Sequence, residues 1–148
     1  MPTRTAAQRR SDTLAALRQH RDVWVASADA AGAAHLIPLS YLWDGERLIL
    51  ATPEASRTAR NLIRAGSARV ALPSPDDVVI IDGTLEFVPT DGAADFADAF
   101  AAAAGFDPRA EPGVYVYIRI TPSRVQAWRD VAELAGRTIM RKGRWLDD

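Results

Sequence analysis

Residues 36–72 read LIPLSYLWDGERLILATPEASRTARNLIRAGSARVAL, and this stretch decides the fold. Residues 35–43 place large apolar side chains at every second position, as a β-strand does. The Asp-Gly pair at 44–45 lies between two apolar runs and predicts a hairpin, with residues 47–52 as the returning strand. Pro38 donates no N–H, so it predicts a sheet edge, a bulge or a close ligand approach.

A short helix is predicted directly after this hairpin. Pro53 ends the strand, residues 56–65 form the helix, and Gly66 is its C-terminal stop. At 100° per residue, the projection separates a basic face from an apolar face. The basic face contains Arg57, Arg60 and Arg64 with Asn61 beside them, and the apolar face, which we expect to dock on the rest of the protein, contains Ala59, Leu62 and Ile63.

The start of this helix is the sharpest functional signal in the chain. Helix N-terminal amides, the Ser56 hydroxyl and the Arg57 guanidinium together suit a phosphate group. Residues 47–69 carry five arginines against one glutamate (net +4), whereas residues 76–111 carry nine acidic residues against one arginine (net −8). A basic segment in a protein of net charge −1 favours a local anionic ligand over a nucleic acid. A capped surface helix with a solvated arginine face remains the alternative.

The rest of the chain predicts short strands with helices outside them. Gly83 is expected to mark a bend in a strand, and Pro122 is expected to interrupt one. On the predicted N-terminal helix, Arg9, Arg10 and Arg18 can stay solvated. We expect one domain (1–148), mostly β: an antiparallel barrel of about six to seven strands with peripheral helices. The predicted elements are a helix over 5–20 (N-terminal segment 1–21), strands over 22–28, 68–74, 77–89, 114–121 and 124–128, a helix over 91–104, and a hairpin or tail over 129–148.

Composition excludes several functional classes. The chain has no cysteine, which removes disulfides, thiolate metal sites and cysteine nucleophiles. Its two histidines, His20 and His35, form no metal-binding or hydrolase pattern, and no Rossmann or P-loop motif occurs. Without a signal peptide or an apolar run of ~18 residues, a cytoplasmic protein is expected. Arginine makes up all but one of the basic residues and alanine is abundant, which is typical of a GC-rich bacterial genome.

These residues resemble a known family. The segment ATPEASRTARNLIRAGSARVAL (51–72), with the preceding IPLSYLWDG (37–45) and the closing ITPSRVQAW (120–128), resembles the pyridoxamine 5′-phosphate oxidase-like, flavin-binding split-barrel superfamily. The resemblance implies a split β-barrel homodimer with two flavin sites at its interface. It also implies a cofactor site whose phosphate is held by Thr52, Ser56 and Arg57, with Thr58, Arg60 and Asn61 beside them. The flavin ring would lie against the strand residues Ile37, Pro38, Leu39 and Ser40. Trp128 would come from the partner subunit.

The resemblance further implies an oxidoreductase that transfers hydride between a small organic substrate and either FMN or the deazaflavin coenzyme factor 420. Many members carry lysine where this chain has Thr58, and Arg60 and Arg64 would compensate or serve a longer anionic tail. The arginine row and the composition, which matches actinobacterial members, favour the deazaflavin. Two alternatives remain: a non-catalytic flavin-binding or carrier protein, and a dimeric scaffold whose arginine face binds an acidic protein. No catalytic side chain and no metal ligand is assigned.

Overall fold

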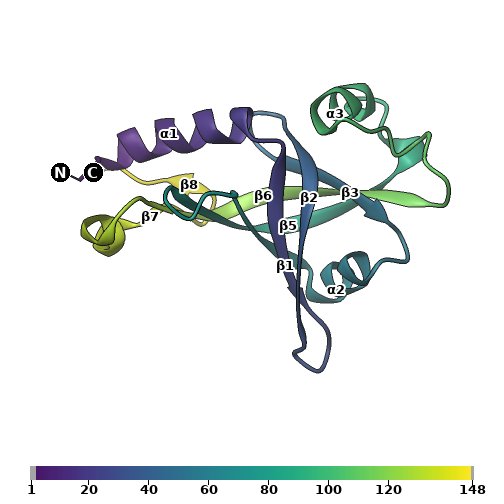
Figure 1. The fold of residues 1–148 in the computed structure, drawn as a ribbon, viewed down its shortest axis with the longest axis horizontal. Helices are drawn as coiled ribbons and strands as arrows, with labels where there is room; N and C mark the ends of the chain where they lie inside the picture. Colours follow the sequence, from purple (N-terminus) through teal and green to yellow (C-terminus); the bar gives the residue numbers. More distant parts are fainter. Residues whose placement is uncertain (1–2, 148) are drawn as a thin grey trace.

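The computed structural model describes residues 3–147 and contains a closed antiparallel barrel. Its sheet runs in the order β3-β2-β1-β4-β5-β6, and β6 pairs back onto β3 to close the ring (Figure 1). The mostly β, antiparallel barrel of about six to seven strands is therefore confirmed: six strands close the ring, and β7 and β8 extend the sheet beyond β6. The strands are β1 Asp22–Ala28, β2 Ala34–Trp43, β3 Leu48–Pro53, β4 Ser67–Ala71, β5 Val78–Pro89, β6 Tyr115–Trp128, β7 Thr138–Arg141 and β8 Arg144–Trp145.

Three α-helices lie outside the barrel: α1 (Ala6–Gln19), α2 (Arg57–Ala65) and α3 (Ala97–Ala104), with two 3₁₀ turns, η1 (Thr90–Gly92) and η2 (Val131–Gly136) (Figure 1). The predicted bounds of α1 and α2 are confirmed, because side-chain caps define where they begin. The predicted helix over 91–104 was too long. Within residues 3–147, no helix is long and apolar enough to cross a membrane.

The shorter α3 has a local cause. Gly92 is the last residue of the single turn η1, and no side chain caps the chain before residue 97. Phe96 then packs edge-on against Tyr117 of β6, with ring centroids 5.1 Å apart. Phe100, one turn later, packs on the same tyrosine at 5.3 Å. These aromatic contacts fix α3 on the outer surface of the barrel, over β3 and β6.

The long strands β5 and β6 bend together at a bulge. Gly83 pairs with Pro122, and Asp82 pairs with Arg124, so that Ser123 is the extra residue on β6. Gly83 therefore marks the predicted bend. The prediction that Pro122 ends its strand was wrong, because the bulge relaxes the ladder there. Pro122 also lies between the stretch of β6 that pairs with β3 and the stretch that pairs with β7.

The C-terminal segment returns to α1 and forms the hairpin alternative, with β7 beside β6. Arg9 was expected to stay solvated but is buried, and its guanidinium donates to the Gly136 carbonyl of η2. Glu133 of η2 is also buried and accepts from the Arg4 guanidinium at 2.7 Å (Nη2 to Oε1) and from the Arg129 amide at 2.8 Å. Charged groups thus connect the two ends of the chain.

This ion pair predicts an acid-sensitive contact. The Arg4 guanidinium and the Arg4 and Arg129 amides lower the pKa of Glu133 from its usual value of 4.5 to about 2. The unfolded chain therefore takes up this proton first, and stability falls as the pH drops from 4.5 toward 2. We expect Glu133→Gln to cost about 1–3 kcal/mol at pH 7 and to flatten this part of the stability profile.

Urea unfolding of both proteins between pH 2 and pH 7 measures this effect. The control is Glu46→Gln, since Glu46 is exposed on the β2–β3 turn and carries the same charge. An unchanged acid profile in Glu133→Gln would show that another carboxyl group controls stability in this range.

Candidate functional site

The barrel is split along one edge of β2. Only residues 41–43 of β2 pair with β3, so β1 is the one described partner of residues 34–40. The Tyr41 amide donates to the Arg21 carbonyl at 2.9 Å, and Tyr41 lies opposite Arg21 when the β1–β2 register is extended by one pair. In an antiparallel sheet, the backbone N–H and C=O groups of successive residues point alternately toward the strand on one side and toward the opposite side. The backbone groups of Leu36, Pro38 and Ser40 therefore face the open edge.

Pro38 fits this edge, because the N–H that it lacks would have pointed away from β1. Ile37 and Leu39, by contrast, use their backbone groups to pair with β1 and turn their side chains inward. Ser40 Oγ donates to Asp22 at 2.6 Å. The sequence singled out residues 37–40, and the residue it missed is Leu36, whose N–H and C=O both face the gap. Its side chain is 60% exposed.

The N-terminus of α2 lies where β3 leaves the barrel. Ser56 is the N-cap and its Oγ accepts from the Ala59 amide at 3.1 Å. The same Oγ lies 3.0 Å from Oγ1 of Thr52, which is buried at the end of β3. Thr52 and Ser56 thus support each other and fix the first turn of the helix. The amides at this end are positive and attract an anion.

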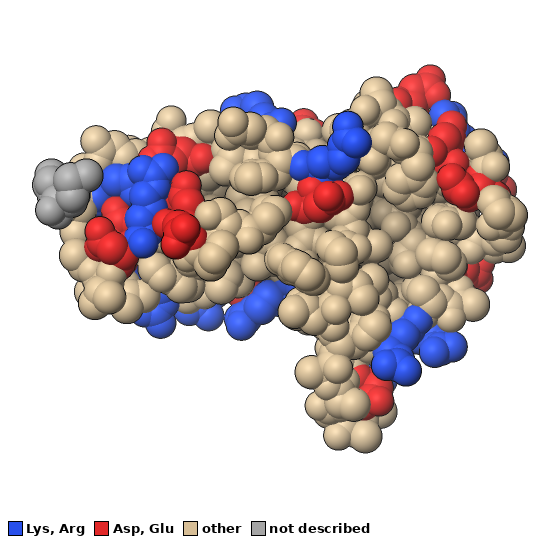
Figure 2. Space-filling model, in the orientation of Figure 1, with Lys and Arg blue, Asp and Glu red and all other residues tan. Residues whose placement is uncertain are grey.

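Two arginines extend from this helix with free guanidinium groups. Arg57 and Arg60 are exposed, and neither guanidinium group forms an ion pair or a hydrogen bond with any residue in 3–147. Arg64 donates to the Ala28 carbonyl at 2.5 Å. Hydrogen bonds from the Ala33 and Ala31 amides, with the charges of Arg64 and Arg57, lower the pKa of Asp29 at the hairpin tip. Figure 2 shows the basic atoms over α2 beside acidic atoms of the β1–β2 hairpin.

The buried face of α2 differs from the predicted one. Asn61 was placed beside the arginines but is buried, and its Nδ2 donates to Ser27 Oγ of β1 at 3.1 Å. Thr58 is 1% exposed and its hydroxyl has no partner in the described residues. Ile63 was expected to be buried but is 57% exposed. Relative to the predicted face, the side of α2 that contacts the barrel is shifted toward Thr58 and Asn61. Leu62 fills the interior of the barrel, as expected.

Trp128 does not meet these groups within one chain. It ends β6, twelve residues beyond Val116, which pairs with Thr52. At about 3.3 Å per residue, this is roughly 40 Å along the strand. Trp128 instead lies opposite Val78, with the Arg137 guanidinium 6.0 Å from its ring centroid. Arg129 beside it contacts Asp77 at 3.3 Å and Asp12 at 3.5 Å.

In chemical terms, the arrangement suits binding and orientation. A helix N-terminus with free arginines can hold an anionic group, and the open edge of β2 offers amides and carbonyls to a planar polar ring. Both features lie on the side where β2 and β3 separate, since within residues 3–147 β2 residues 34–40 pair only with β1 and β3 residues 51–53 only with β6, and α2 crosses from the end of β3 to the β1–β2 hairpin (Figure 1). No group of three potential metal ligands occurs among the described residues.

Comparison with known proteins identifies the family. The family model described as pyridoxamine 5′-phosphate oxidase matches residues 11–129, which is most of the chain. The chain belongs to the pyridoxamine 5′-phosphate oxidase family. Its split barrel is the fold of the wider pyridoxamine 5′-phosphate oxidase-like superfamily, as the motifs in residues 37–72 imply. No curated protein sequence matches the chain.

Solved structures share the fold at low identity. A putative pyridoxamine 5′-phosphate oxidase from Listeria innocua is 18% identical over 81% of this chain and 98% of its own, with a TM-score of 0.66. An F420 reductase is 19% identical over 75% and 93%, with a TM-score of 0.63. The heme storage protein HutZ from Vibrio cholerae is 15% identical over 77% and 91%, with a TM-score of 0.58. At these identities the likeness shows the fold alone.

Proposed function

We propose that this protein binds a flavin-type cofactor, FMN or the deazaflavin factor 420, and transfers hydride between it and a small organic substrate. The phosphate would lie at the N-terminus of α2, near Ser56, Arg57 and Arg60. The ring would lie along the open edge of β2, at residues 36–40. When bound, the cofactor supplies the hydride chemistry, and the chain binds it, orients it and excludes water.

One observation supports this proposal: a capped helix N-terminus with two free arginine side chains and an unpaired strand edge both lie where β2 and β3 separate. Thr52 strengthens the phosphate end by holding Ser56 in place at 3.0 Å. Thr58 and Asn61 would act from beneath the helix, since both are buried. Leu36 joins the proposed ring contacts because its backbone groups face the open edge, whereas Ile37 and Leu39 would contribute through packing.

The proposed site is completed by a second copy of the chain. Trp128 lies roughly 40 Å along β6 from the residue that pairs with Thr52, so it reaches the cofactor only from a partner protomer. The expected assembly is therefore a homodimer with two equivalent sites. Arg129 is held by Asp77 and Asp12 and is not assigned to the cofactor or the substrate.

Arg57→Ala is expected to weaken cofactor binding by about tenfold, because the variant removes one charge-assisted contact to phosphate. Fluorescence titration of the full chain with FMN and with the deazaflavin measures the change. Arg141→Ala is the matched control, since Arg141 is exposed on β7 and this substitution removes the same charge far from α2. Equal affinity in both variants would remove Arg57 from the site.

A non-catalytic flavin-binding or carrier protein is the second candidate, and Thr58 favours it. Many family members carry lysine there, whereas this side chain is a short hydroxyl buried under α2. A carrier would bind reduced cofactor but would not speed its reoxidation by organic acceptors. Absorbance at the cofactor band, followed with and without a panel of acceptors, separates the two candidates, because only an enzyme gives acceptor-dependent turnover.

A further inference from the structure

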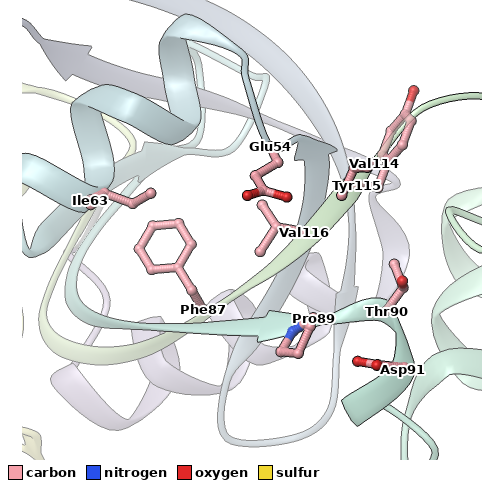
Figure 3. A pocket seen from close by; sticks show the side chains of 9 residues that line it. All are labelled: Glu54, Ile63, Phe87, Pro89, Thr90, Asp91, Val114, Tyr115 and Val116. Atoms are coloured by element: carbon pink, nitrogen blue, oxygen red, sulfur yellow. The ribbon is translucent and has the colours of Figure 1, made fainter.

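A cavity of about 460 Å³ opens on the other side of the turn that follows β3. Figure 3 shows that it lies between α2, the end of β5 with η1, and the start of β6. Its volume is within the range of small-molecule sites. None of its nine lining residues is assigned to the proposed cofactor site.

The walls of this cavity are apolar. Phe87 and Val116 are half-buried at its floor, where they extend the barrel core. Ile63 is 57% exposed and Val114 67% exposed, and both line the cavity. In Figure 3 the Ile63 side chain extends from α2 toward Phe87. Ile63, which was predicted to be buried, therefore faces the cavity. Exposed apolar side chains that converge in this way indicate a binding surface.

Two carboxylates enter the same cavity, and none of its lining residues is basic. Glu54 points in from the β3–α2 turn and Asp91 from η1 on the opposite wall (Figure 3). Neither side chain forms an ion pair or a hydrogen bond with any residue in 3–147. The Glu54 amide donates to the Val114 carbonyl at 2.8 Å, which fixes the turn against β6. The Thr90 hydroxyl adds a further polar group.

From this combination, we infer that the cavity binds a small organic cation, a protonated amine attached to an aromatic or branched aliphatic body. The apolar body would pack between Ile63, Phe87 and Val116, and the ammonium group would lie between Glu54 and Asp91. Acidic and apolar groups select against anions, because an anion would be repelled by both carboxylates. Arg60 lines only an adjoining groove of about 610 Å³, which shares Glu54 and Val114 with the cavity.

The test uses three probes of one shape: phenethylammonium, neutral 2-phenylethanol and anionic phenylacetate. Chemical-shift titration of the full, isotope-labelled chain is expected to show saturable binding of phenethylammonium, with shifts at Ile63 and Val116. Phenylacetate is expected to bind at least tenfold more weakly. Binding of phenylacetate as tight as that of the ammonium probe, or no saturable shift with the ammonium probe, would overturn the inference.

Variants locate the charge. Glu54→Gln with Asp91→Asn is expected to weaken phenethylammonium binding by about tenfold and to leave 2-phenylethanol unchanged, since two partly solvated ion pairs are lost. Glu46→Gln, an exposed acid on the β2–β3 turn, is the control and should bind like the parent protein. Unchanged binding in the double variant would contradict the assignment.

Two further readouts separate this site from the alternatives. Saturation with FMN should leave the phenethylammonium shifts at Ile63 intact, and displacement would merge the cavity with the cofactor site and overturn the inference. Light scattering of Ile63→Asn should show the parent oligomeric state. A loss of oligomer would instead identify this face as a contact between copies of the chain.

Discussion

Gly83→Ala is expected to destabilise the protein by about 3 kcal/mol and to lower its melting temperature by roughly 6–12 °C. A Cβ atom at Gly83 would lie 2.4 Å from the Thr121 carbonyl oxygen and 2.7 Å from Ile120 Cγ2. The first contact is with backbone, which cannot rotate away. To relieve it, β5 and β6 must separate at the bulge where both strands bend to close the barrel.

The matched control is Gly92→Ala. An added Cβ there would approach no atom closer than Pro89 Cγ at 3.4 Å, and Gly92 has no left-handed φ angle. Calorimetry or urea unfolding of the two variants compares their effects directly. A melting temperature for Gly83→Ala equal to that of Gly92→Ala would mean that the bulge can shift without cost.

Phe100→Ala is expected to cost about 3–5 kcal/mol, because it removes a fully buried ring and leaves a cavity. The ring lies 5.3 Å from that of Tyr117 and 5.7 Å from that of Phe106, in edge-on packing. These contacts hold α3 on the barrel. The variant should therefore lose amide protection first in residues 97–104, and then melt roughly 6–20 °C below the parent protein.

Hydrogen exchange and thermal unfolding check this expectation, with Val131→Ala as the control for apolar truncation. Val131 is 82% exposed, so its loss should change stability by no more than about 0.5 kcal/mol. If Phe100→Ala behaved like Val131→Ala, the aromatic contacts between α3 and Tyr117 of β6 would contribute little to the stability of the fold.

Elements with strong local signals were predictable from the sequence. The helix α2 begins after Ser56 and ends before Gly66, as its cap residues predict, and Gly66 adopts the left-handed conformation of a C-cap. The hairpin at 44–45 likewise depends on short-range backbone geometry, with Gly45 at a positive φ. Such signals lie within a few residues, so no knowledge of the packing was needed.

The wrong predictions concern residues whose surroundings are determined by packing between distant segments of the chain. Pro122 breaks a regular ladder, but the bulge at Gly83 absorbs it. Arg9 is polar, but the C-terminal turn η2 covers it and accepts its hydrogen bond. Ile63 lies on the apolar side of a helical projection, yet the barrel contacts the neighbouring arc. A projection gives the spacing of side chains but does not show which element covers them.

The candidate site was partly accessible from the sequence. The proposed anion-binding groups could be named because Ser56, Arg57 and Arg60 lie close together at the start of one helix. Leu36 was not among the predicted residues because its proposed contribution comes from backbone direction, which depends on the register between β1 and β2. The placement of Trp128 depends on a second copy of the chain and stays a prediction.

Parallel fluorescence titrations of the purified full chain with FMN and with the deazaflavin test the central claim most directly. The account predicts saturable binding of at least one cofactor, one per protomer, that is weakened in Arg57→Ala and retained in Arg141→Ala. Saturable binding of neither cofactor would contradict the account and would leave the arginine face of α2 without a flavin.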